Sequence, residues 1–349
     1  MPAKATVRII ASGQLSDTQG HDLLSYYLEK SSWKVSEWTG SFTQRAWAKL
    51  LRYFSPYRQL SPKRAYQLFL ANWLPDSGEL LHFIWGDAIL EATSRPERGI
   101  FTLHQPWEHW TELTWKKISE CAGIICMAEP ERDEINRRCP QVPCTFIPHG
   151  INIDFWCPLP TPPKRQICAA GMHLRNLEML LRVAHILLER HPDITFRWLV
   201  NPNFKLSPSL SSKLPPARFE IIQNLSADQL HQFLAESWLF CIPYNNVAAS
   251  NAIVEALACG TPVFTTSVGG MASYAGDGII TMVENNDDTA MVAAVTRCLA
   301  SAELRNELSS RSRQYAVTQL SWPIVVEKHA AFYKNILHGT SASLPPNRV

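Results

Sequence analysis

Short apolar runs alternate with segments of helical length along most of the chain, and this alternation is the sequence feature that most narrows the fold. The runs in the first half are VRIIAS, LLHFIW, GIFTLH, AGIICMA and CTFIPHG, and those in the second half are QICAAG, ITFRWLV, RFEIIQ, WLFCIPY, TPVFTT and GIITMV. Their length of roughly five residues and their lack of polar alternation are typical of strands that are buried on both faces. The pattern predicts an α/β fold with doubly wound parallel sheets.

The stretch CPLPTPPKR at residues 157–165 has four prolines in nine positions. It predicts a stiff linker, because proline fixes φ and lacks an amide donor. The chain of 349 residues is longer than one hydrophobic core usually supports. We therefore expect an N-terminal domain over 1–156 and a C-terminal domain over 166–320, followed by a helix at about 321–337 and a disordered tail over 338–349. Ligands of such folds bind at the carboxyl ends of strands, here in a cleft between the two halves.

Composition excludes several classes of function. The net charge is +2, so no general attraction to nucleic acid is expected. No apolar run approaches the roughly 18 residues of a membrane span, and the apolar part of MPAKATVRIIASG is too short for a signal peptide. The nine cysteines form no CxxC pair and most lie in apolar runs, which is typical of reduced core cysteines. These features predict a cytoplasmic protein.

The segment SNAIVEALACGTPVFTTSVGG at residues 250–270 predicts a short helix that ends at a glycine and is followed by a strand. Ser250 and Asn251 are good N-cap residues, and the unpaired N–H groups of a helix start suit phosphate oxygens. Glu255, just past the first turn, could accept hydrogen bonds from both hydroxyls of a ribose. The alternative is that Glu255 is a solvent-exposed residue on a surface helix, as most glutamates are.

Four sequence blocks in the same order resemble one known family. The block EALACGTPV at residues 255–263 resembles the donor-binding signature of retaining glycosyltransferases with the GT-B fold, the GT4 family. The segment IPHGINIDFWCP resembles the family's exit from its first domain, and AAGMHLRNLEMLLRVAHIL resembles the glycine–basic–helix segment that opens its second domain. The segment SWPIVVEKHAAFYKNIL resembles the family's closing helix.

This resemblance implies two Rossmann-like domains that face each other across a cleft, with the helix at about 321–337 packed on the first domain. It also implies sugar transfer with retention, without a side-chain nucleophile or a cofactor. No DxD motif occurs, so no metal is expected. The sequence departs from the family pattern at Val247, where the family has a glutamate that touches the donor sugar, and near Met172, where it has an arginine. Arg175 then remains as the cation for the diphosphate, and Asn245 or Asn246 could contact the sugar instead.

The first half contributes further candidates. In FTLHQPWEHW, His104 ends a strand, and the resemblance implies that a histidine so placed lies against the transferred sugar. A plain polar strand cap is the alternative, and His82 and Asp87 are weaker rivals. The segment SGQLSDTQGHDLL resembles the family's glycine-rich first loop, in which Gly20 would let backbone approach the diphosphate.

A basic and aromatic segment runs from Trp38 to Pro75 without a single acidic residue. Arg45, Lys49 and Arg52 have the spacing of one helical face, and a basic face beside aromatic residues is typical of helices at a membrane surface. The alternatives are a solvated helix, an acceptor-groove lining and, less favoured, a nucleic-acid contact. The segment predicts peripheral binding to an anionic membrane on its inner face.

Taken with these features, the resemblance implies a retaining, metal-independent hexosyltransferase. It would move a sugar from a nucleotide-sugar donor to a hydroxyl of a glycan or lipid-linked acceptor, in glycolipid or surface polysaccharide assembly. Two other functions remain open. One is a GT-B sugar-nucleotide epimerase, which would need acid/base carboxylates in the cleft. The other is a nucleotide-sugar-binding protein with weak or no catalysis.

Overall fold

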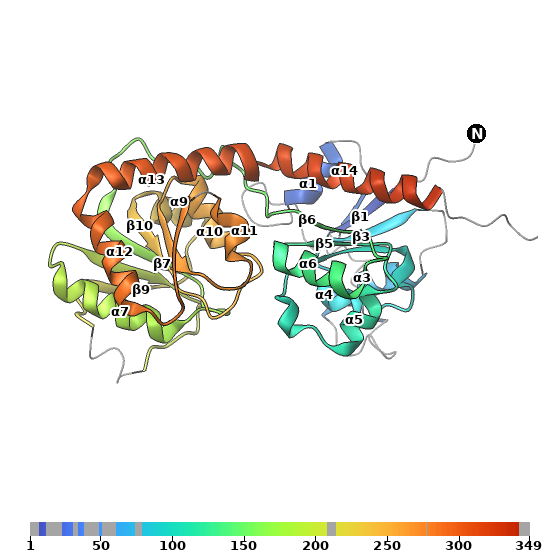
Figure 1. Cartoon of the computed structure of the whole chain (residues 1–349), viewed down its shortest axis with the longest axis horizontal. Coiled ribbons are helices and arrows are strands. Elements are labelled where there is room, and N and C mark those ends of the chain that lie inside the picture. Colours follow the sequence, from blue (N-terminus) through green and yellow to red (C-terminus); the bar gives the residue numbers. More distant parts are fainter. Residues whose placement is uncertain are drawn as a thin grey trace, which may run out of the picture. The chain divides into compact units, whose positions relative to one another are not determined.

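The chain divides into two compact units, which are described separately below. Unit 1 comprises Met1–Gly150 and Trp322–Val349, and unit 2 comprises Ile151–Ser321. The computed structural model (Figure 1) describes residues 7–11, 23–30, 34–37, 49–50, 61–73, 79–207, 214–276 and 278–341.

Unit 1 is built on a six-stranded sheet in the order β2-β1-β3-β4-β5-β6. Every neighbouring pair of strands in it is parallel, and β4 and β5 are buried along their whole length. This burial explains why these strands read as continuous apolar runs. The strands are β1 (Val7–Ala11), β2 (Lys34–Glu37), β3 (Leu80–Phe83), β4 (Gly99–Leu103), β5 (Gly123–Cys126) and β6 (Cys144–Phe146).

Helices accompany this sheet in unit 1. The start of α5 carries a reciprocal capping box in which Thr111 and Thr114 bond each other's backbone amides, which satisfies two N–H groups of the first turn. The helices are α1 (Leu23–Lys30), α3 (Pro62–Trp73), α4 (Asp87–Leu90), α5 (Glu112–Ile118), α6 (Glu129–Arg138) and α14 (Trp322–Ser341), with 3-10 turns η2 (Pro96–Arg98) and η3 (Trp107–His109).

The helix α14 packs closely on unit 1 because two glycines leave room for its side chains. A Cβ on Gly123 would lie 2.5 Å from Ile336 Cδ1, and one on Gly150 would lie 2.3 Å from Trp322 Cε3. The hydroxyl of Tyr333 is hydrogen-bonded to His82 Nδ1 at 2.6 Å, inside the core. The helix expected at about 321–337 is thus part of unit 1. It continues to Ser341, four residues into the segment expected to be a disordered tail.

Unit 2 has a second six-stranded parallel sheet in the order β12-β11-β10-β7-β8-β9. If the six strands of this unit are numbered 1 to 6 from β7 to β12 (β7, β8, β9, β10, β11, β12), the order across the sheet from β9 is 3-2-1-4-5-6. The direction of winding therefore reverses between β7 and β10. The strands are β7 (Lys164–Ala170), β8 (Thr195–Leu199), β9 (Phe219–Ile222), β10 (Ser237–Cys241), β11 (Val263–Thr266) and β12 (Ile280–Val283). This is the strand order of a Rossmann-like domain.

In unit 2, α7 and α12 lie side by side, and α10 packs against α9 and α13 (Figure 1). The buried face of α7 includes Met179, Val183 and Leu187, at the spacing of an amphipathic helix. The helices are α7 (Leu177–Arg190), α9 (Ala227–Ala235), α10 (Asn251–Ala258), α11 (Ala272–Ala275), α12 (Asp288–Ala300) and α13 (Ala302–Tyr315), with the 3-10 turn η4 (Gly269–Met271) and the π-helix η5 (Ala316–Leu320).

The boundary between the units differs from the expected one. Residues 151–156 belong to unit 2, not to the N-terminal domain, and β7 begins at Lys164, inside the expected linker 157–165. Tertiary contacts explain why residues 151–156 belong to unit 2. The Arg313 guanidinium donates to the carbonyls of Ile153 at 2.9 Å and Trp156 at 2.8 Å, and the Trp156 side chain is fully buried.

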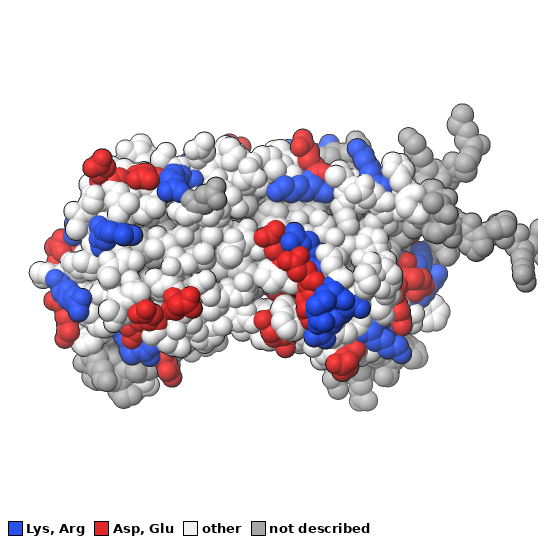
Figure 2. Space-filling model, in the orientation of Figure 1, with Lys and Arg blue, Asp and Glu red and all other residues white. Residues whose placement is uncertain are grey.

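The predicted α/β class with two doubly wound parallel sheets is confirmed. All nine cysteines lie in the described ranges and none forms a disulfide. No helix in these ranges combines the length and apolarity that crossing a bilayer requires. On the face drawn in Figure 2, basic and acidic side chains are interspersed in small groups, as expected for a chain of net charge +2.

Candidate functional site

Two loops of unit 2 meet where the direction of winding reverses. One loop, residues 171–176, follows β7, and the other, residues 242–250, follows β10. They are joined by hydrogen bonds from Asn176 N to Pro243 O and from Asn245 N to Leu174 O, both 2.9 Å. Both loops leave the carboxyl ends of their strands, and the crevice at such a switch point is where doubly wound sheets bind ligands.

Arg175 is held in this crevice by packing as well as by hydrogen bonds. Its guanidinium carbon lies 4.6 Å from the centroid of the Tyr244 ring, an arrangement that contributes about 0.5–2 kcal/mol. On its other side is Gly171, whose φ is +86° and where a Cβ would approach Arg175 Nη2 to 2.9 Å. Nη1 donates to the His173 carbonyl at 2.6 Å, and the buried Nε meets no acceptor in the described structure. The cation is therefore fixed in place with donor capacity left over.

Ser250 connects this arginine to the start of α10. It occupies the N-cap position, as the sequence predicts, but its hydroxyl makes no capping hydrogen bond. Instead the hydroxyl accepts from Tyr244 Oη at 2.7 Å and from Arg175 Nη2 at 3.4 Å. Tyr244 is fully buried, and burial raises the pKa of its phenol against the opposing effects of Arg175 and of the Ser250 bond.

The helix start is consequently left open to a ligand. The first intrahelical bond runs from Val254 N to Ser250 O at 3.2 Å. The N–H groups of Asn251, Ala252 and Ile253 find no acceptor among the residues that the structure describes. Asn251 is itself exposed. Three unsatisfied donors at the positive end of a helix favour an anion.

Glu255 is buried, with 7% of its surface exposed. Glu255 is therefore not the solvent-exposed surface glutamate that was the alternative prediction. Desolvation raises the pKa of its carboxyl to about 7, and within the described ranges no side chain or amide donates to the carboxyl. A buried carboxyl without a donor is costly unless a ligand supplies one, so Glu255 can accept from hydroxyl groups.

Asparagine side chains surround the same loops. Asn245 is exposed, and its Nδ2 donates to the Arg175 carbonyl at 3.4 Å. Asn246 is half-buried and accepts from the Val247 amide at 2.7 Å, while Val247 itself is buried. A third asparagine, Asn176, joins the loop after β7 to the one after β12, since its Nδ2 lies 2.8 Å from Oδ1 of both Asn285 and Asn286. Asn245 and Asn246 thus serve mainly to fix loop backbone here.

Gly269 closes the back of the loop after β10. Its φ is +50°, and a Cβ there would lie 2.3 Å from the Val247 carbonyl oxygen and 2.4 Å from Asn246 Oδ1. The next amide, that of Gly270, donates to the Val247 carbonyl at 2.6 Å. The loop after β11 therefore presses directly on the loop after β10, and only glycine permits this approach.

The histidine predicted from the sequence, His104, lies in unit 1 at the carboxyl end of β4. Its ring stacks on Trp85 with centroids 4.1 Å apart, and its Nε2 donates to the Ile84 carbonyl at 2.8 Å, which makes Nε2 the protonated nitrogen. Asp87 accepts from the amides of His104 and Gln105 and so fixes this turn. The neighbouring His149 is buried, and burial lowers its pKa to about 3.

The other predicted residues are placed as follows. Met172 is half-buried, and His82 is in the core, bonded to Thr102 Oγ1 at 2.7 Å. Lys49 is helical and exposed. Gly20, Arg45 and Arg52 lie outside the described residues. In the described ranges no three His, Cys, Asp or Glu side chains gather as a metal-binding group.

Sequence reasoning missed Tyr244 and Thr266. Thr266 bonds both the amide and the carbonyl of Tyr244 at 2.8 Å and thereby fixes the platform under Arg175. Tyr244 ends the apolar run WLFCIPY, and a polar-tipped aromatic residue directly after a buried strand is the signal that could have found it.

Comparison with known proteins agrees with this geometry. Residues 168–315 match the sequence model of the family Glycosyl transferases group 1. Alpha-maltose-1-phosphate synthase of Mycolicibacterium smegmatis is 23% identical over 259 residues, which cover 65% of this chain and 66% of the relative. MMP alpha-(1->4)-mannosyltransferase of Mycolicibacterium hassiacum is 25% identical over 56% of this chain and 49% of its own. This chain thus matches about half to two thirds of the length of these relatives.

Two solved structures resemble the whole chain in fold. Sucrose-phosphate synthase from Thermosynechococcus elongatus aligns with a TM-score of 0.70 and 14% identity over 96% of this chain and 100% of its own. Anabaena Alr3699/HepE in complex with UDP-glucose aligns with a TM-score of 0.67 and 13% identity over 94% and 99%. The chain has two doubly wound units and aligns with these structures over nearly its whole length. It therefore has the GT-B fold of glycosyltransferases. The stretch that matches the family Glycosyl transferases group 1, residues 168–315, lies within unit 2, as does the site.

Proposed function

We propose that the protein is a glycosyltransferase that uses a nucleotide sugar and binds its nucleoside diphosphate part at the switch point of unit 2. The observation that carries the proposal is Glu255, a buried carboxyl without a donor and with its pKa raised to about 7. It lies one turn beyond a helix start with free N–H groups. A ligand that has a vicinal hydroxyl pair and a diphosphate supplies both missing partners, hydrogen bonds to the carboxylate and an anion for the amides.

In this proposal Arg175 and the start of α10 share the diphosphate. The arginine is held by Tyr244 and Gly171, so little side-chain entropy is lost when it binds. Its guanidinium can grip phosphate oxygens in bidentate fashion. Ser250, whose hydroxyl accepts from both Arg175 and Tyr244, keeps the cation beside the helix start.

We infer a retaining transfer without a metal or a side-chain nucleophile. The bond between the anomeric carbon and the diphosphate breaks, and both of its electrons go to the diphosphate oxygen. The acceptor hydroxyl forms the new bond on the same face of the sugar and gives its proton to a phosphate oxygen. The charge that develops on the leaving diphosphate is stabilised by Arg175 and by the α10 amides, so catalysis consists mainly of positioning and electrostatics.

The names of the relatives support a sugar donor of this kind. They include a maltose-1-phosphate synthase and a mannosyltransferase, and one structural neighbour holds UDP-glucose. From them we propose a hexose donor and a hydroxyl acceptor on a glycan or a lipid-linked sugar.

The test is isothermal titration with UDP-, GDP- and ADP-hexoses, followed by an assay of transfer to sugar acceptors. We expect one nucleotide class to bind, and Glu255→Ala and Arg175→Ala each to weaken binding at least tenfold. Arg190→Ala, an exposed arginine at the end of α7, is the matched control and should bind normally. No binding of any nucleotide sugar would overturn the proposal.

The same assay separates the two alternative functions. A sugar-nucleotide epimerase would interconvert its nucleotide sugar without any acceptor. A binding protein would bind with the same dependence on Glu255 and Arg175 but release no nucleoside diphosphate with any acceptor.

For unit 1 we propose that His104 contacts the reacting sugar. The Trp85 stack and the bond to the Ile84 carbonyl fix the ring orientation, which suits a positioning contact. We expect His104→Ala to lower kcat with little change in nucleotide affinity. An unchanged kcat would leave His104 as a structural strand cap.

We also propose that unit 1 binds anionic membranes through the basic segment of Arg45, Lys49 and Arg52. In the described part of this region, Lys49 and Leu50 are exposed and the Trp73 side chain is 68% exposed, as at interfacial sites. Cosedimentation with phosphatidylserine vesicles should fall when the three cations are changed to glutamate. Equal binding by the variant and the wild type would contradict this.

A further inference from the structure

One residue of unit 2 has a backbone conformation that is costly for its type. Leu174, in the loop after β7, has a φ of +59°. The Cβ of an L-residue is crowded in this left-handed region, so glycine and asparagine usually occupy it. Among the residues that the structure describes, Leu174 is the one with positive φ that is neither glycine nor asparagine. It directly precedes Arg175, the cation of the proposed diphosphate site.

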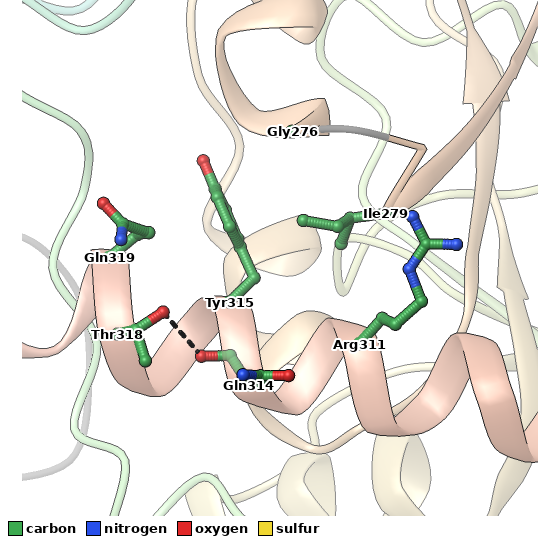
Figure 3. A pocket seen from close by; sticks show the side chains of 7 residues that line it. All are labelled: Gly276, Ile279, Arg311, Gln314, Tyr315, Thr318 and Gln319. Atoms are coloured by element: carbon green, nitrogen blue, oxygen red, sulfur yellow. Dashed lines mark hydrogen bonds between the residues drawn. The ribbon is translucent and has the colours of Figure 1, made fainter.

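The other left-handed positions of unit 2 follow the rule, and Gly276 is an example. It has a φ of +48° directly after α11, and a Cβ there would lie 2.5 Å from Ile279 Cδ1 and 3.5 Å from Tyr315 Cε2. Figure 3 shows both side chains near it. Gly276 precedes β12 and so lies toward the amino edge of the sheet, whereas the switch-point crevice is at the carboxyl edge. Leu174 departs from the rule at the crevice itself.

Backbone contacts hold the turn at Leu174 from both sides. Arg175 N donates back to the Met172 carbonyl at 3.2 Å, which closes a four-residue turn with Leu174 at its third position, where positive φ usually calls for glycine. The Leu174 carbonyl accepts from Asn245 N at 2.9 Å, and Arg175 forms an isolated antiparallel bridge with Tyr244. A strained residue persists where its surroundings fix it in this way. Rotation of φ to the usual negative range would break one of these connections.

The same turn determines where the Arg175 side chain goes. The side chain folds back over its own loop, so that Nη1 donates to the His173 carbonyl at 2.6 Å and Nη2 lies against Gly171. These two partners precede Arg175 by two and four positions, and the guanidinium reaches them because the chain reverses at Leu174. The reversal also brings the guanidinium over the Tyr244 ring. A straightened loop would leave the cation without these supports.

We propose that Leu174 is a positioning residue of the diphosphate site. Its left-handed turn holds the Arg175 guanidinium against Tyr244, so that the cation meets phosphate oxygens without rearranging first. Leu174 acts through Arg175 and not by a contact of its own with the ligand. This inference rests on the proposed function of the crevice.

Titration calorimetry with UDP, GDP, ADP and inorganic diphosphate tests the inference. Leu174→Val and Leu174→Thr introduce β-branched side chains, for which the left-handed region is least accessible. We expect each to weaken the binding of the probe that the wild type binds by at least fivefold. Leu174→Asn is close to leucine in size and tolerates positive φ, so its affinity should stay within twofold of the wild type. Leu174 is a half-buried loop residue, so all three variants should fold.

Two further variants separate positioning from a general loss of stability. In an Arg175→Ala background, Leu174→Val should change the affinity less than twofold, because the residue through which Leu174 acts is gone. Gly276→Ala introduces strain at another left-handed position, away from the crevice. It should lower the midpoint of urea unfolding and leave the affinity for the probe unchanged.

Three results would overturn the inference. If Leu174→Val and Leu174→Thr bind as tightly as the wild type, the inference fails and the proposed function stands. If Leu174→Val weakens binding equally with and without Arg175, Leu174 acts by another route and the inference fails again. If the wild type binds none of the four probes, the inference and the proposed function fail together.

Discussion

The phenol of Tyr244 donates a 2.7 Å hydrogen bond to the hydroxyl of Ser250, and this bond takes the N-cap hydroxyl away from its own helix. The Tyr244 ring meanwhile supports the Arg175 guanidinium. One buried side chain therefore both frees the amides of α10 and positions the cation beside them. The arrangement makes the roles of the ring and of the hydroxyl separable by mutation.

Tyr244→Phe removes the hydroxyl and keeps the ring, while Tyr244→Leu removes both. We expect Tyr244→Phe to lower the free energy of unfolding by about 1 kcal/mol, the contribution of one buried hydrogen bond. The affinity of the Tyr244→Phe variant for the nucleotide sugar should fall a few fold, because the Ser250 hydroxyl can then turn to cap α10. The Tyr244→Leu variant should bind up to about tenfold more weakly still, since it also lacks the cation–π contact with Arg175.

Titration calorimetry on both variants checks this, with urea unfolding as the measure of stability. Equal nucleotide affinities in the Phe and Leu variants would show that the ring does not position Arg175.

Glu255 should make unit 2 less stable as the pH rises. Burial raises the pKa of its carboxyl from the ordinary value of 4.5 to about 7 in the folded protein, so between these pH values the folded state binds more protons than the unfolded state. Stability therefore falls from about pH 4.5 to 7 and stays low above that, by an amount on the order of 3 kcal/mol. Glu255→Gln should match the wild type in urea unfolding at pH 5 and exceed it at pH 8. A constant difference between the two proteins at both pH values would contradict the raised pKa.

The same carboxyl should couple nucleotide binding to protons. If sugar hydroxyls donate to Glu255, they stabilise the carboxylate and lower its pKa in the complex, so binding below pH 7 releases a proton. The affinity for a nucleotide sugar should then rise between pH 5.5 and 7.5 by up to about tenfold per pH unit. In Glu255→Gln the affinity should be lower and nearly independent of pH. Calorimetry in buffers of different ionisation enthalpy measures the proton directly, and an absence of proton release would remove Glu255 from the hydroxyl contact.

Gly269 and Gly278 provide a matched pair of substitutions. Both have positive φ, but a Cβ on Gly269 would lie 2.3 Å from the Val247 carbonyl oxygen, whereas the nearest atom at Gly278 is 3.5 Å away. Gly278→Ala should cost about 1 kcal/mol from backbone strain alone. Gly269→Ala should cost more than about 3 kcal/mol and displace the loop that holds Asn246, with loss of nucleotide binding. Similar unfolding midpoints for the two variants would refute the close packing of these loops.

Buried histidines should make unit 1 sensitive to acid. Burial lowers the pKa of His329 to about 4, so between pH 6.5 and 4 the unfolded state binds a proton that the folded state excludes. Stability is then fully present above pH 6.5 and is lost toward pH 4, by an amount on the order of 3 kcal/mol for this residue. His329→Gln should reduce this pH dependence by about one proton, measured by hydrogen exchange of unit 1 amides. His338→Gln, at an exposed position of the same helix, is the control and should change nothing.

The sequence alone determined the layered α/β architecture and the place of the candidate site along the chain. Strands that are buried on both faces must be continuously apolar, so runs such as GIFTL and GIIC identify them without any tertiary information. The block at residues 250–263 likewise carries its own local signals: an N-cap residue, a short apolar helix and Gly260, whose φ is +68° at the helix end.

Only the tertiary structure decided how those residues act. Arg175 and Ser250 are 75 positions apart in the chain. Tyr244 contacts both, Arg175 through its ring and Ser250 through its hydroxyl, yet in the sequence it is only the last residue of an apolar run. The unit boundary moved to Ile151 because Arg313, about 160 positions later, binds the carbonyl of Ile153. The exposure of Glu255, and with it a pKa near 7, depends on what α9, α13 and η5 place around α10. Contacts between distant segments depend on packing in three dimensions, which local sequence patterns do not encode.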